Sequence, residues 1–582
     1  MTIMRGYITV RADVLVIGSG AAGIRTAIEA HDSGVQDVIV LGKCKKGDAH
    51  TVLATGGINA ALGTMDPEDS WLIHAADTLM EGWSIADYRA VETLCKNGPD
   101  AVNELVRWGA RFHREKNGKL TQRFFGAHTY RRTCFYGDQT GKEIMRVLIG
   151  QAEKRKIKFM DSMFVVSLLK GPSGVKGALC IDFKNGRMVV FSAKAVVIAA
   201  GGYTKLYSRS SSRSYENHGD GAALALNIGI DLVNMEMVQF HPTGMVYPKS
   251  AVGTLVTEAV RGEGGTLLNA KGERFMKRYD PVRMELGPRD EVSRAIFNEI
   301  NKGNGTKHGG VYLDITNVPK NKILERLPKM YRQFKELNGI DISKERMEVA
   351  PTAHYTMGGV DVSLTGETKI KGLFAVGETV GQIHGANRLG GNSLLETVVY
   401  GKIVGREAAK IAKESERNPL TLIEIENTIA HIDSFFGNGG AKVEDIRAEM
   451  QALMWDDVGI VRNETDMKAA LDRIMGLKID FTSVRVPHGL KNNIELKVAL
   501  ETEKMLPLCE AVVRSALIRE ESRGAHYRSD YKKMSDDWLA ETVTRNEGGR
   551  VAIYKRQMPK AEGRLAETVR KMKERASHKL LE

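Results

Sequence analysis

Three features that mark membrane, secreted or metal-cluster proteins are missing from this chain of 582 residues. No apolar run approaches the length of about 18 residues that crosses a bilayer, which argues against a membrane-spanning helix. The N-terminus lacks a long apolar segment with a cleavage site, so we expect neither a secretory signal nor a presequence. The five cysteines are scattered without CxxC spacing. We therefore expect no disulfide, no zinc or iron–sulfur site and no other metal in this chain.

Acidic residues are the minority, because 84 Lys and Arg face 72 Asp and Glu and give a formal net charge of +12. The basic excess gathers in residues 541–582, where Leu565, Val569 and Met572 follow helical spacing and predict a basic amphipathic helix. Nucleic acid, an anionic membrane surface and an acidic protein are candidate ligands, and a solvated helix face is the simplest interpretation. Without interleaved aromatic residues or a recognition helix, we expect no nucleic acid partner.

Nucleotide binding is indicated by residues 13–23, DVLVIGSGAAG, in which a buried strand runs into a GxGxxG pattern. Gly18 permits a tight turn, Gly20 lets the backbone approach a pyrophosphate, and Gly23 lets the next helix pack close to the sheet. The following helix is expected at 21–31. Phosphates bind at such a helix N-terminus because free N–H groups and the positive end of the helix dipole meet there.

Two later segments repeat the pattern of a strand that ends in glycine. AVVIAAGG at 195–202 precedes a glycine turn with Asp220 before a helix, and GLFAVGE at 372–378 ends in an acid. Elements so far apart predict one nucleotide domain assembled from discontinuous segments. NAD and FAD both fit at this point. The strand expected at 37–41 is followed by Gly-Lys where an acid would bind the adenosine ribose, which weakens the simplest NAD interpretation.

Longer motifs, which occur in a fixed order, resemble a single family. They are HTVLATGGINAALG (50–63), QFHPTG (239–244), TEAVRGEGG (257–265), PRDEVSRAI (288–296), PTAHYTMGGV (351–360), HGANRLGGNSLLE (384–396) and ESRGAHYRSDY (521–531). Together they resemble the flavoprotein subunit of succinate dehydrogenase and fumarate reductase from about residue 12 to about residue 540. The resemblance implies an FAD-dependent oxidoreductase that interconverts succinate and fumarate.

The cofactor site implied by this resemblance is centred on His50. Taken alone, His50 in GDAHTVLATGG is a polar loop residue; in the family, the histidine of this motif attaches FAD covalently. Gly56 and Gly57 would leave room for the isoalloxazine, and Glu378 would contact the ribose. The remaining residues expected at the FAD are Gly18, Gly20, Ala21, Ala22, Gly23, Lys43, Thr51, Ala54, Ala200, Gly201, Asp220, Asn392, Ser393 and Leu394.

The implied substrate is a small dicarboxylate, which the protein must hold by both carboxylates while a hydride and a proton move. Arg offers forked, cationic donors that suit a carboxylate. Taken singly, such residues have plain alternatives, since a histidine before proline is also typical of a turn. By resemblance, the residues that clamp or pack against the substrate are Phe125, His241, Thr257, His354 and Arg388.

Proton transfer is assigned by the resemblance to Arg289, with Glu258 and Arg261 completing a path to solvent. A guanidinium is very hard to deprotonate. Neighbouring positive charges and relay through Glu258 would lower that cost. Glu258 is otherwise a structural partner of Arg261, and these three roles are hypotheses.

The expected fold class is α/β, with a discontinuous FAD-binding Rossmann-like domain, an inserted α+β capping domain and a following helical domain. The resemblance places the FAD-binding domain at 1–240 and 355–425 and the capping domain at 241–354, where it would move to close the site. Helical spacing in KVEDIRAEMQALMWDDVG supports a helical domain at 426–540. A basic C-terminal tail occupies 541–582.

Electrons that leave the flavin need an acceptor, because no cluster ligands are expected in this chain. The resemblance implies an iron–sulfur subunit, together with one or more membrane anchor subunits carrying a quinone site. We therefore expect a peripheral location on the cytoplasmic side of the inner membrane, held by these partner subunits.

Three alternatives remain beside this interpretation. A soluble fumarate reductase would need no separate iron–sulfur chain. L-aspartate oxidase shares several motifs but lacks the flavin-attaching histidine at the position of His50. A non-catalytic flavin-binding assembly subunit predicts loss of one or more of His241, Arg289, His354 and Arg388, all of which are present.

Overall fold

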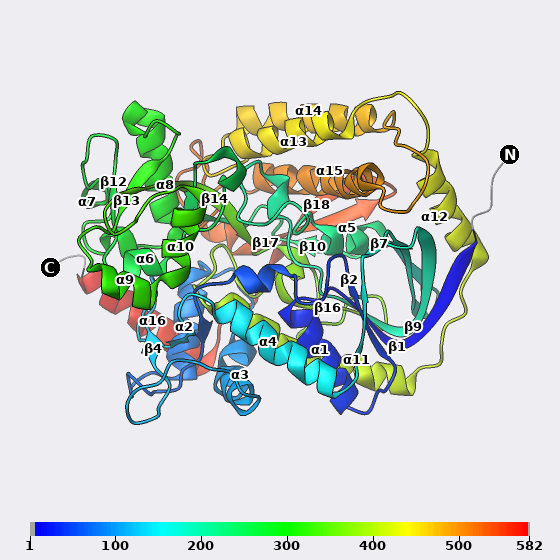
Figure 1. Ribbon diagram of the computed structural model, residues 1–582, viewed down its shortest axis with the longest axis horizontal. Coiled ribbons are helices and arrows are strands. Elements are labelled where there is room, and N and C mark those ends of the chain that lie inside the picture. The colour runs from blue at the N-terminus through cyan, green and yellow to red at the C-terminus, as the bar shows by residue number, and fades with distance from the viewer. Residues whose placement is uncertain (1–5, 580–582) are drawn as a thin grey trace.

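The computed structural model describes residues 6–579, and its largest sheet, toward the right in Figure 1, is mixed and has helices on both faces. The sheet order is β6-β2-β1-β9-β8-β7, with β16 also paired to β9. The strands are β1 (Tyr7–Ile17), β2 (Val38–Gly42), β6 (Lys158–Asp161), β7 (Met163–Gly171), β8 (Gly174–Asp182), β9 (Arg187–Ile198) and β16 (Leu373–Ala375). β6, β2, β1, β9 and β16 run in parallel, so their carboxyl ends share the edge where α/β proteins bind ligands.

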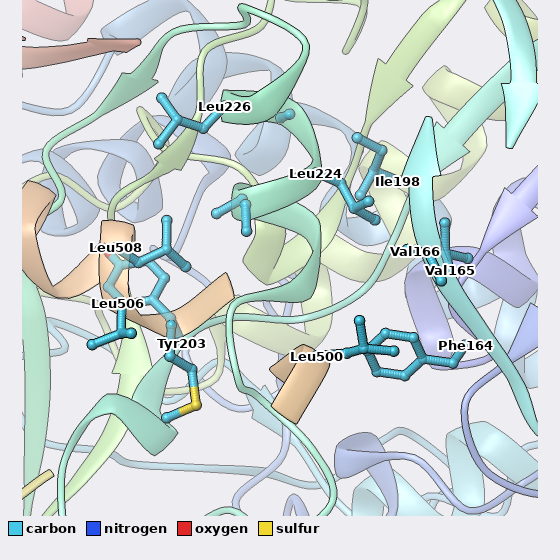
Figure 2. Packing of buried hydrophobic residues seen from close by; sticks show 14 of the residues in the cluster. Phe164, Val165, Val166, Ile198, Tyr203, Leu224, Leu226, Leu500, Leu506 and Leu508 are labelled. Carbon is cyan, nitrogen blue, oxygen red and sulfur yellow. The ribbon is translucent and has the colours of Figure 1, made fainter. Parts of the chain in front are cut away.

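Successive residues of β1 enter two separate cores because strand side chains alternate between the faces of a sheet. Val14 and Val16 pack with α1 (Ala21–Asp32) and α11 (Asn392–Glu414). Leu15 and Ile17 belong to the opposite core, together with α5 (Asp220–Asn227) and α15 (Ile494–Ile518). Figure 2 shows part of this second core, which joins the sheet to the C-terminal helices. On the first face lies α4 (Thr140–Lys154), which contacts α1.

The helical region covers the upper side of the view in Figure 1. Its helices are α12 (Leu422–Ser434), α13 (Val443–Asp456), α14 (Glu464–Phe481) and α15. Of the residues whose helical spacing predicts the packed face of α13, Ile446, Met450 and Met454 are buried and Leu453 is half-buried. α15 packs against α13, α14 and α5 and thereby ties this region to the nucleotide fold.

The cap is a separate sheet with its own core, at the left in Figure 1. Its strand order is β11-β14-β13-β12, formed by β11 (Val238–Met245), β14 (Met347–Thr356), β13 (Val311–Asp314) and β12 (Thr266–Leu268). β11 leads into the cap and β14 leads out, and the two strands pair antiparallel. Helices α6 (Ala259–Gly262), α8 (Arg289–Glu299), α9 (Lys320–Arg326) and α10 (Pro328–Leu337) lie in the same segment. The expected fold class is confirmed; the domain boundaries stay predictions.

The C-terminal segment contains more than the expected helix. β17 (Ala540–Glu547) and β18 (Arg550–Gln557) form a hairpin that pairs with β10 (Leu232–Val233) before α16 (Gly563–Lys579) begins. Leu565 is buried against α2 (Trp71–Glu81) and α3 (Tyr88–Arg107), with Val569 and Met572 packed beside it. The apolar stripe of α16 is therefore covered by the chain itself.

Short elements complete the described chain. They are β3 (Ile58–Asn59), β4 (Gln122–Arg123), β5 (Thr133–Cys134), β15 (Gly359–Val360), α7 (Met276–Tyr279) and the helical turns η1 (His50–Leu53), η2 (Thr204–Leu206), η3 (Lys249–Ala251), η4 (Met284–Leu286), η5 (Ile300–Asn304), η6 (Gly377–Thr379) and η7 (Asp536–Trp538). None of the helices within residues 6–579 has the length and apolar character needed to span a bilayer.

Candidate active site

One cavity of about 310 Å³ is lined both by the glycine turn after β1 and by residues of the cap. The predicted cofactor residues that line it are Gly18, Gly20, Ala21, Ala22, Lys43, His50, Thr51, Ala54, Gly56, Gly57, Ala200, Gly201, Asp220, Glu378, Ser393 and Leu394. The predicted substrate and proton-transfer residues in the same wall are Phe125, His241, Thr257, Glu258, Arg289, His354 and Arg388. Three predicted residues of the described chain lie behind the wall: Gly23, Arg261 and Asn392.

The nucleotide end of this cavity is shaped by backbone that excludes side chains. Gly18 has φ +121°, and an added Cβ there would overlap the carbonyl oxygen of Ala199. A Cβ at Gly23 would overlap the carbonyl oxygen of Gly18, so this glycine acts through helix–strand packing. The N-terminus of α1 opens onto the cavity at Ala21, whose N–H donates to Thr51 Oγ1 at 3.2 Å. This cradle fits the diphosphate of a dinucleotide.

Lys43 and Asp220, both expected at the cofactor, are bound to each other. Lys43 Nζ donates to Asp220 Oδ2 at 2.7 Å and to Glu501 Oε1 of α15 at 3.1 Å. Burial opposes the charge of Lys43, but the two carboxylates raise its pKa above the usual value. The helical region thus contributes Glu501 to the support of a cofactor-site residue.

Asn392 is directed away from the cavity into a buried hydrogen-bond network. Its Oδ1 accepts from Asn59 Nδ2 at 2.7 Å and contacts His74 Nε2 at 2.8 Å, while its Nδ2 donates to Thr78 Oγ1 at 2.9 Å. Asn392 therefore fixes the start of α11, and its neighbours Ser393 and Leu394 reach the cavity.

At the other end of the cavity, two arginines from different segments meet on one amide. Gln239 is fully buried, and its Oε1 accepts from Arg289 Nη1 at 2.9 Å and from Arg388 Nη2 at 3.0 Å. Its Nε2 donates to the backbone oxygen of Arg388 at 2.9 Å. Burial and the charge of Arg289 lower the pKa of Arg388 to about 10. Two cationic forks are thus held side by side at the wall.

The proposed proton path begins at a short ion pair. Arg289, the first residue of α8, donates from Nε and Nη2 to Glu258 Oε2 at 3.0 and 2.9 Å. Arg261 Nη2 lies 3.9 Å from the same carboxylate oxygen. Burial would raise the pKa of Glu258, but Arg289 and Arg261 hold it well below its ordinary value. The three side chains form a continuous charged series, in which Arg261 is the member remote from the cavity.

The two predicted substrate histidines face each other across paired strands. The ring centroids of His241 (β11) and His354 (β14) lie 5.2 Å apart. Ser211 Oγ is 2.8 Å from His354 Nδ1, and His241 Nδ1 contacts the backbone of Thr243. Burial and neighbouring positive charges lower the pKa of both imidazoles well below the usual range. Both rings are therefore neutral near pH 7.

Known proteins match this chain over most of its length. The FAD binding domain family matches residues 13–394, and the fumarate reductase flavoprotein C-terminal family matches residues 447–574. The chain is a member of the succinate dehydrogenase/fumarate reductase flavoprotein family. The predicted family and its cofactor, FAD, are thereby confirmed.

Relatives of this flavoprotein carry both names of the family. It is 46% identical to a fumarate reductase (CoM/CoB) chain of Methanothermobacter marburgensis, over 90% of this chain and 95% of that one. It is 36% identical to the succinate dehydrogenase flavoprotein subunit of Rickettsia felis, over 95% and 96%. Among solved structures, a quinol fumarate reductase chain of E. coli superposes with a TM-score of 0.90 at 33% identity, covering 95% of this chain and 99% of that one.

Sequence reasoning missed several residues of this flavoprotein site. Gln239 lies two residues before His241 on the same strand, so strand alternation was a usable signal for its direction. Ser211 and Glu216 line the cavity from an irregular segment, and no sequence pattern predicts their position. Tyr355 lines the cavity next to His354, with the Arg388 guanidinium 4.3 Å from its ring centroid. Glu501 lies more than four hundred residues from Lys43 in the chain.

Proposed function

We propose that this flavoprotein interconverts succinate and fumarate and passes electrons to an iron–sulfur partner subunit. The observation that carries the proposal is the convergence of Arg289, Arg388, His241 and His354 on the cavity that also contains the glycine cradle. Two cationic forks and two neutral imidazoles suit a small dianion. A dinucleotide cradle in the same cavity would place a redox group next to that dianion.

The residues that would hold FAD are those of the cradle and its surroundings. Gly18, Gly20 and the N-terminus of α1 would take the diphosphate, and the segment Ser393–Leu394 would bound the ring system. When bound, FAD supplies hydride transfer at its N5 atom. His50 would attach it covalently, and Glu378, whose pKa burial raises to about 7, would contact the ribose.

The dicarboxylate would be held by direct contacts from the cap and from the loop before α11. Arg388 would bind one carboxylate, while His354, His241 and Thr257 would donate to the substrate oxygens. Because both imidazoles are neutral, each carries one N–H and adds no charge that would favour one substrate over the other. Phe125, which is buried at the wall, would exclude water beside the reacting carbons.

Arg289 would hold and move the proton. Glu258 contacts Arg289 and lies near Arg261. Its carboxylate would relay the proton between these two guanidinium groups. Arg289→Gln should then remove turnover while leaving the flavin spectrum unchanged.

The partners and their location follow from the same family. An iron–sulfur subunit, with membrane anchor subunits carrying a quinone site, would place the flavoprotein peripherally on the cytoplasmic side of the inner membrane. The relative that is 46% identical is named for CoM/CoB, so a partner that uses a donor of that kind is the second candidate.

The deciding experiment uses the purified chain loaded with FAD. Turnover is measured with succinate and an artificial acceptor, and with fumarate and an artificial donor, while acid-precipitated protein is examined for retained flavin. Turnover of either dicarboxylate is the expected result, with flavin retained in the precipitate. Aspartate turnover with freely extractable flavin would favour L-aspartate oxidase instead.

A further inference from the structure

His50 contacts a carboxylate that belongs neither to the predicted substrate residues nor to the nucleotide-binding motifs. It begins η1, lines the cavity and keeps 24% of its side chain exposed. Its Nδ1 lies 3.0 Å from Oε1 of Glu216, which lines the same cavity and is 11% exposed. The two residues come from segments 166 positions apart. Their contact is a product of the fold.

Glu216 is itself immobilised by Arg213. The backbone N–H and Nε of Arg213 donate to Glu216 Oε1 at 3.0 and 3.1 Å, and Nη2 donates to Oε2 at 3.0 Å. Nη1 of the same guanidinium contacts Asp48, to which the Tyr215 hydroxyl also donates at 3.3 Å. One arginine thus joins the loop before His50 to the loop that carries Glu216. The carboxylate is fixed in direction as well as in place.

A fixed carboxylate at Nδ1 decides which nitrogen of His50 can react. A neutral imidazole carries its proton on one nitrogen only, and the hydrogen bond at the other determines which. With Nδ1–H donated to Glu216, the lone pair remains on Nε2. Only a nitrogen with a free lone pair can form a bond to carbon.

We propose that Glu216 is a positioning residue for the covalent attachment of the flavin to His50, holding Nδ1–H so that Nε2 is the atom that forms the bond. The inference rests on the covalent attachment advanced above as part of the proposed function. It assigns to Glu216 the orientation of the ring and the stabilisation of the charge that bond formation creates.

Attachment exchanges one C–H bond of the flavin for one C–N bond. Nε2 forms a bond to a methyl carbon of the flavin ring, which loses one C–H bond. The electron pair of that bond enters the isoalloxazine, the proton is taken up there or by solvent, and the flavin is left reduced by two electrons. Fumarate, the oxidant of the proposed reaction, then takes up the pair with two protons and becomes succinate.

Glu216 would contribute most as the bond forms and positive charge develops on the ring. The alkylated ring that still carries Nδ1–H is a cation, and a carboxylate at 3.0 Å stabilises it by a charge-assisted hydrogen bond. Removing the negative charge but not the shape should slow attachment by roughly 10–100-fold. An aspartate, which keeps the charge on a shorter stem, should recover part of the loss.

The test follows attachment itself and not turnover. Apo-chain is incubated with FAD and fumarate, samples are denatured in acid, and flavin fluorescence in the protein band is recorded against time. The variants are Glu216→Gln and Glu216→Asp, with Arg213→Gln releasing the clamp while leaving the carboxylate. Glu153→Gln, a surface carboxylate paired with Lys46, is the matched control. Equilibrium binding of FAD to each apo-chain is measured in parallel.

The expected result is slow attachment in Glu216→Gln, partial rescue in Glu216→Asp, an intermediate rate in Arg213→Gln and a wild-type rate in Glu153→Gln. FAD binding before attachment should change by no more than a few-fold. Equal rates in wild type and Glu216→Gln would overturn the role of Glu216 and leave covalent attachment standing. Extractable flavin in the wild type would overturn both, whatever the turnover.

A pH profile separates positioning from a merely structural role. Burial lowers the pKa of His50, but Glu216 and the charge of Glu378 raise it above its usual value. The charge of Arg213 opposes this rise. His354 and the pair Asp48–Tyr215 complete the titratable surroundings. Since attachment needs neutral Nε2, the rate should fall on acidification, and in Glu216→Gln this fall should move to lower pH. An unmoved profile would contradict the proposal, and Arg213→Gln provides the same comparison if Glu216→Gln does not fold.

Discussion

The two ends of the cavity are built in opposite ways. The nucleotide end is made of backbone: β1, a glycine turn and α1, which follow one another within residues 7–32. The dicarboxylate end is made of side chains from β11, α8, β14, the residues just before α6 and the loop before α11, spread from His241 to Arg388. Cofactor binding therefore depends on glycines that lack side-chain atoms, and the reaction depends on where the charged side chains lie. Substitutions at the two ends should fail in different ways.

Arg289→Gln should produce the largest effect on turnover. It removes the guanidinium that contacts Glu258 and Gln239, and loss of a positioned acid–base group costs roughly a thousandfold in kcat. Flavin content and its absorbance spectrum should stay unchanged, because the nucleotide end is untouched. Steady-state fumarate reduction measures the effect. Near-normal turnover would require another proton donor.

Gly18→Ala should destroy cofactor binding instead. The left-handed φ of +121° and the overlap with the Ala199 carbonyl together cost about 3 kcal/mol of folding stability. We expect a lower melting temperature and protein purified without flavin.

Gly20→Ala is the matched control for that substitution. Its φ of −78° suits alanine, and the added Cβ would lie 3.5 Å from Thr51 Oγ1, an ordinary contact. The melting temperature of the apo-chain should change little, while FAD affinity falls because the methyl group faces the cavity. Equal melting temperatures for Gly18→Ala and Gly20→Ala would show that backbone strain is not what distinguishes this end.

Gln239→Leu should have an intermediate effect at the dicarboxylate end. The buried guanidinium of Arg388 and the partly exposed guanidinium of Arg289 lose their shared acceptor, and an unsatisfied buried polar group costs about 1–3 kcal/mol. We expect kcat/KM to fall roughly 10–100-fold, with KM for the dicarboxylate rising as the forks separate. The control is Gln333→Leu, because Gln333 also lines the cavity and donates to the backbone oxygen of Leu255. In this variant kcat/KM should fall much less. Similar losses in both variants would mean that the contact of Gln239 with Arg289 and Arg388 has no special role.

The smallest effect should be that of pH on substrate affinity. Burial, and then nearby positive charge, lowers the pKa of His241 and His354 well below the usual value of about 6.5. Both imidazoles are therefore already neutral at pH 6, so KM should stay flat between about pH 6 and 8. Were either needed as a cation, KM would rise with pH through this window. Measuring KM at constant ionic strength distinguishes the two.

Local patterns predicted the nucleotide end well. The strand ends at Ile17 and the helix begins at Ala21, as GxGxxG requires, because turn geometry and strand alternation are set by neighbouring residues. The α13 face was predicted for the same reason. The hairpin at 540–557 was missed although its signal is local, because β17 and β18 meet at Gly548–Gly549, a two-residue turn with positive φ at both glycines. Only the pairing of β17 with β10, three hundred residues earlier, lies beyond local patterns.

The sequence by itself determined the parallel nucleotide fold, the helical region and, through motif order, the family. The tertiary structure alone decided which charges meet. Gln239 joins Arg289 to Arg388, Glu216 reaches His50, and Glu501 reaches Lys43. Hydrogen bonding within a turn or helix is local and leaves a pattern in the chain. The contacts of buried charges depend on how whole layers pack, and they are specified only when the sheet, cap and helices come together.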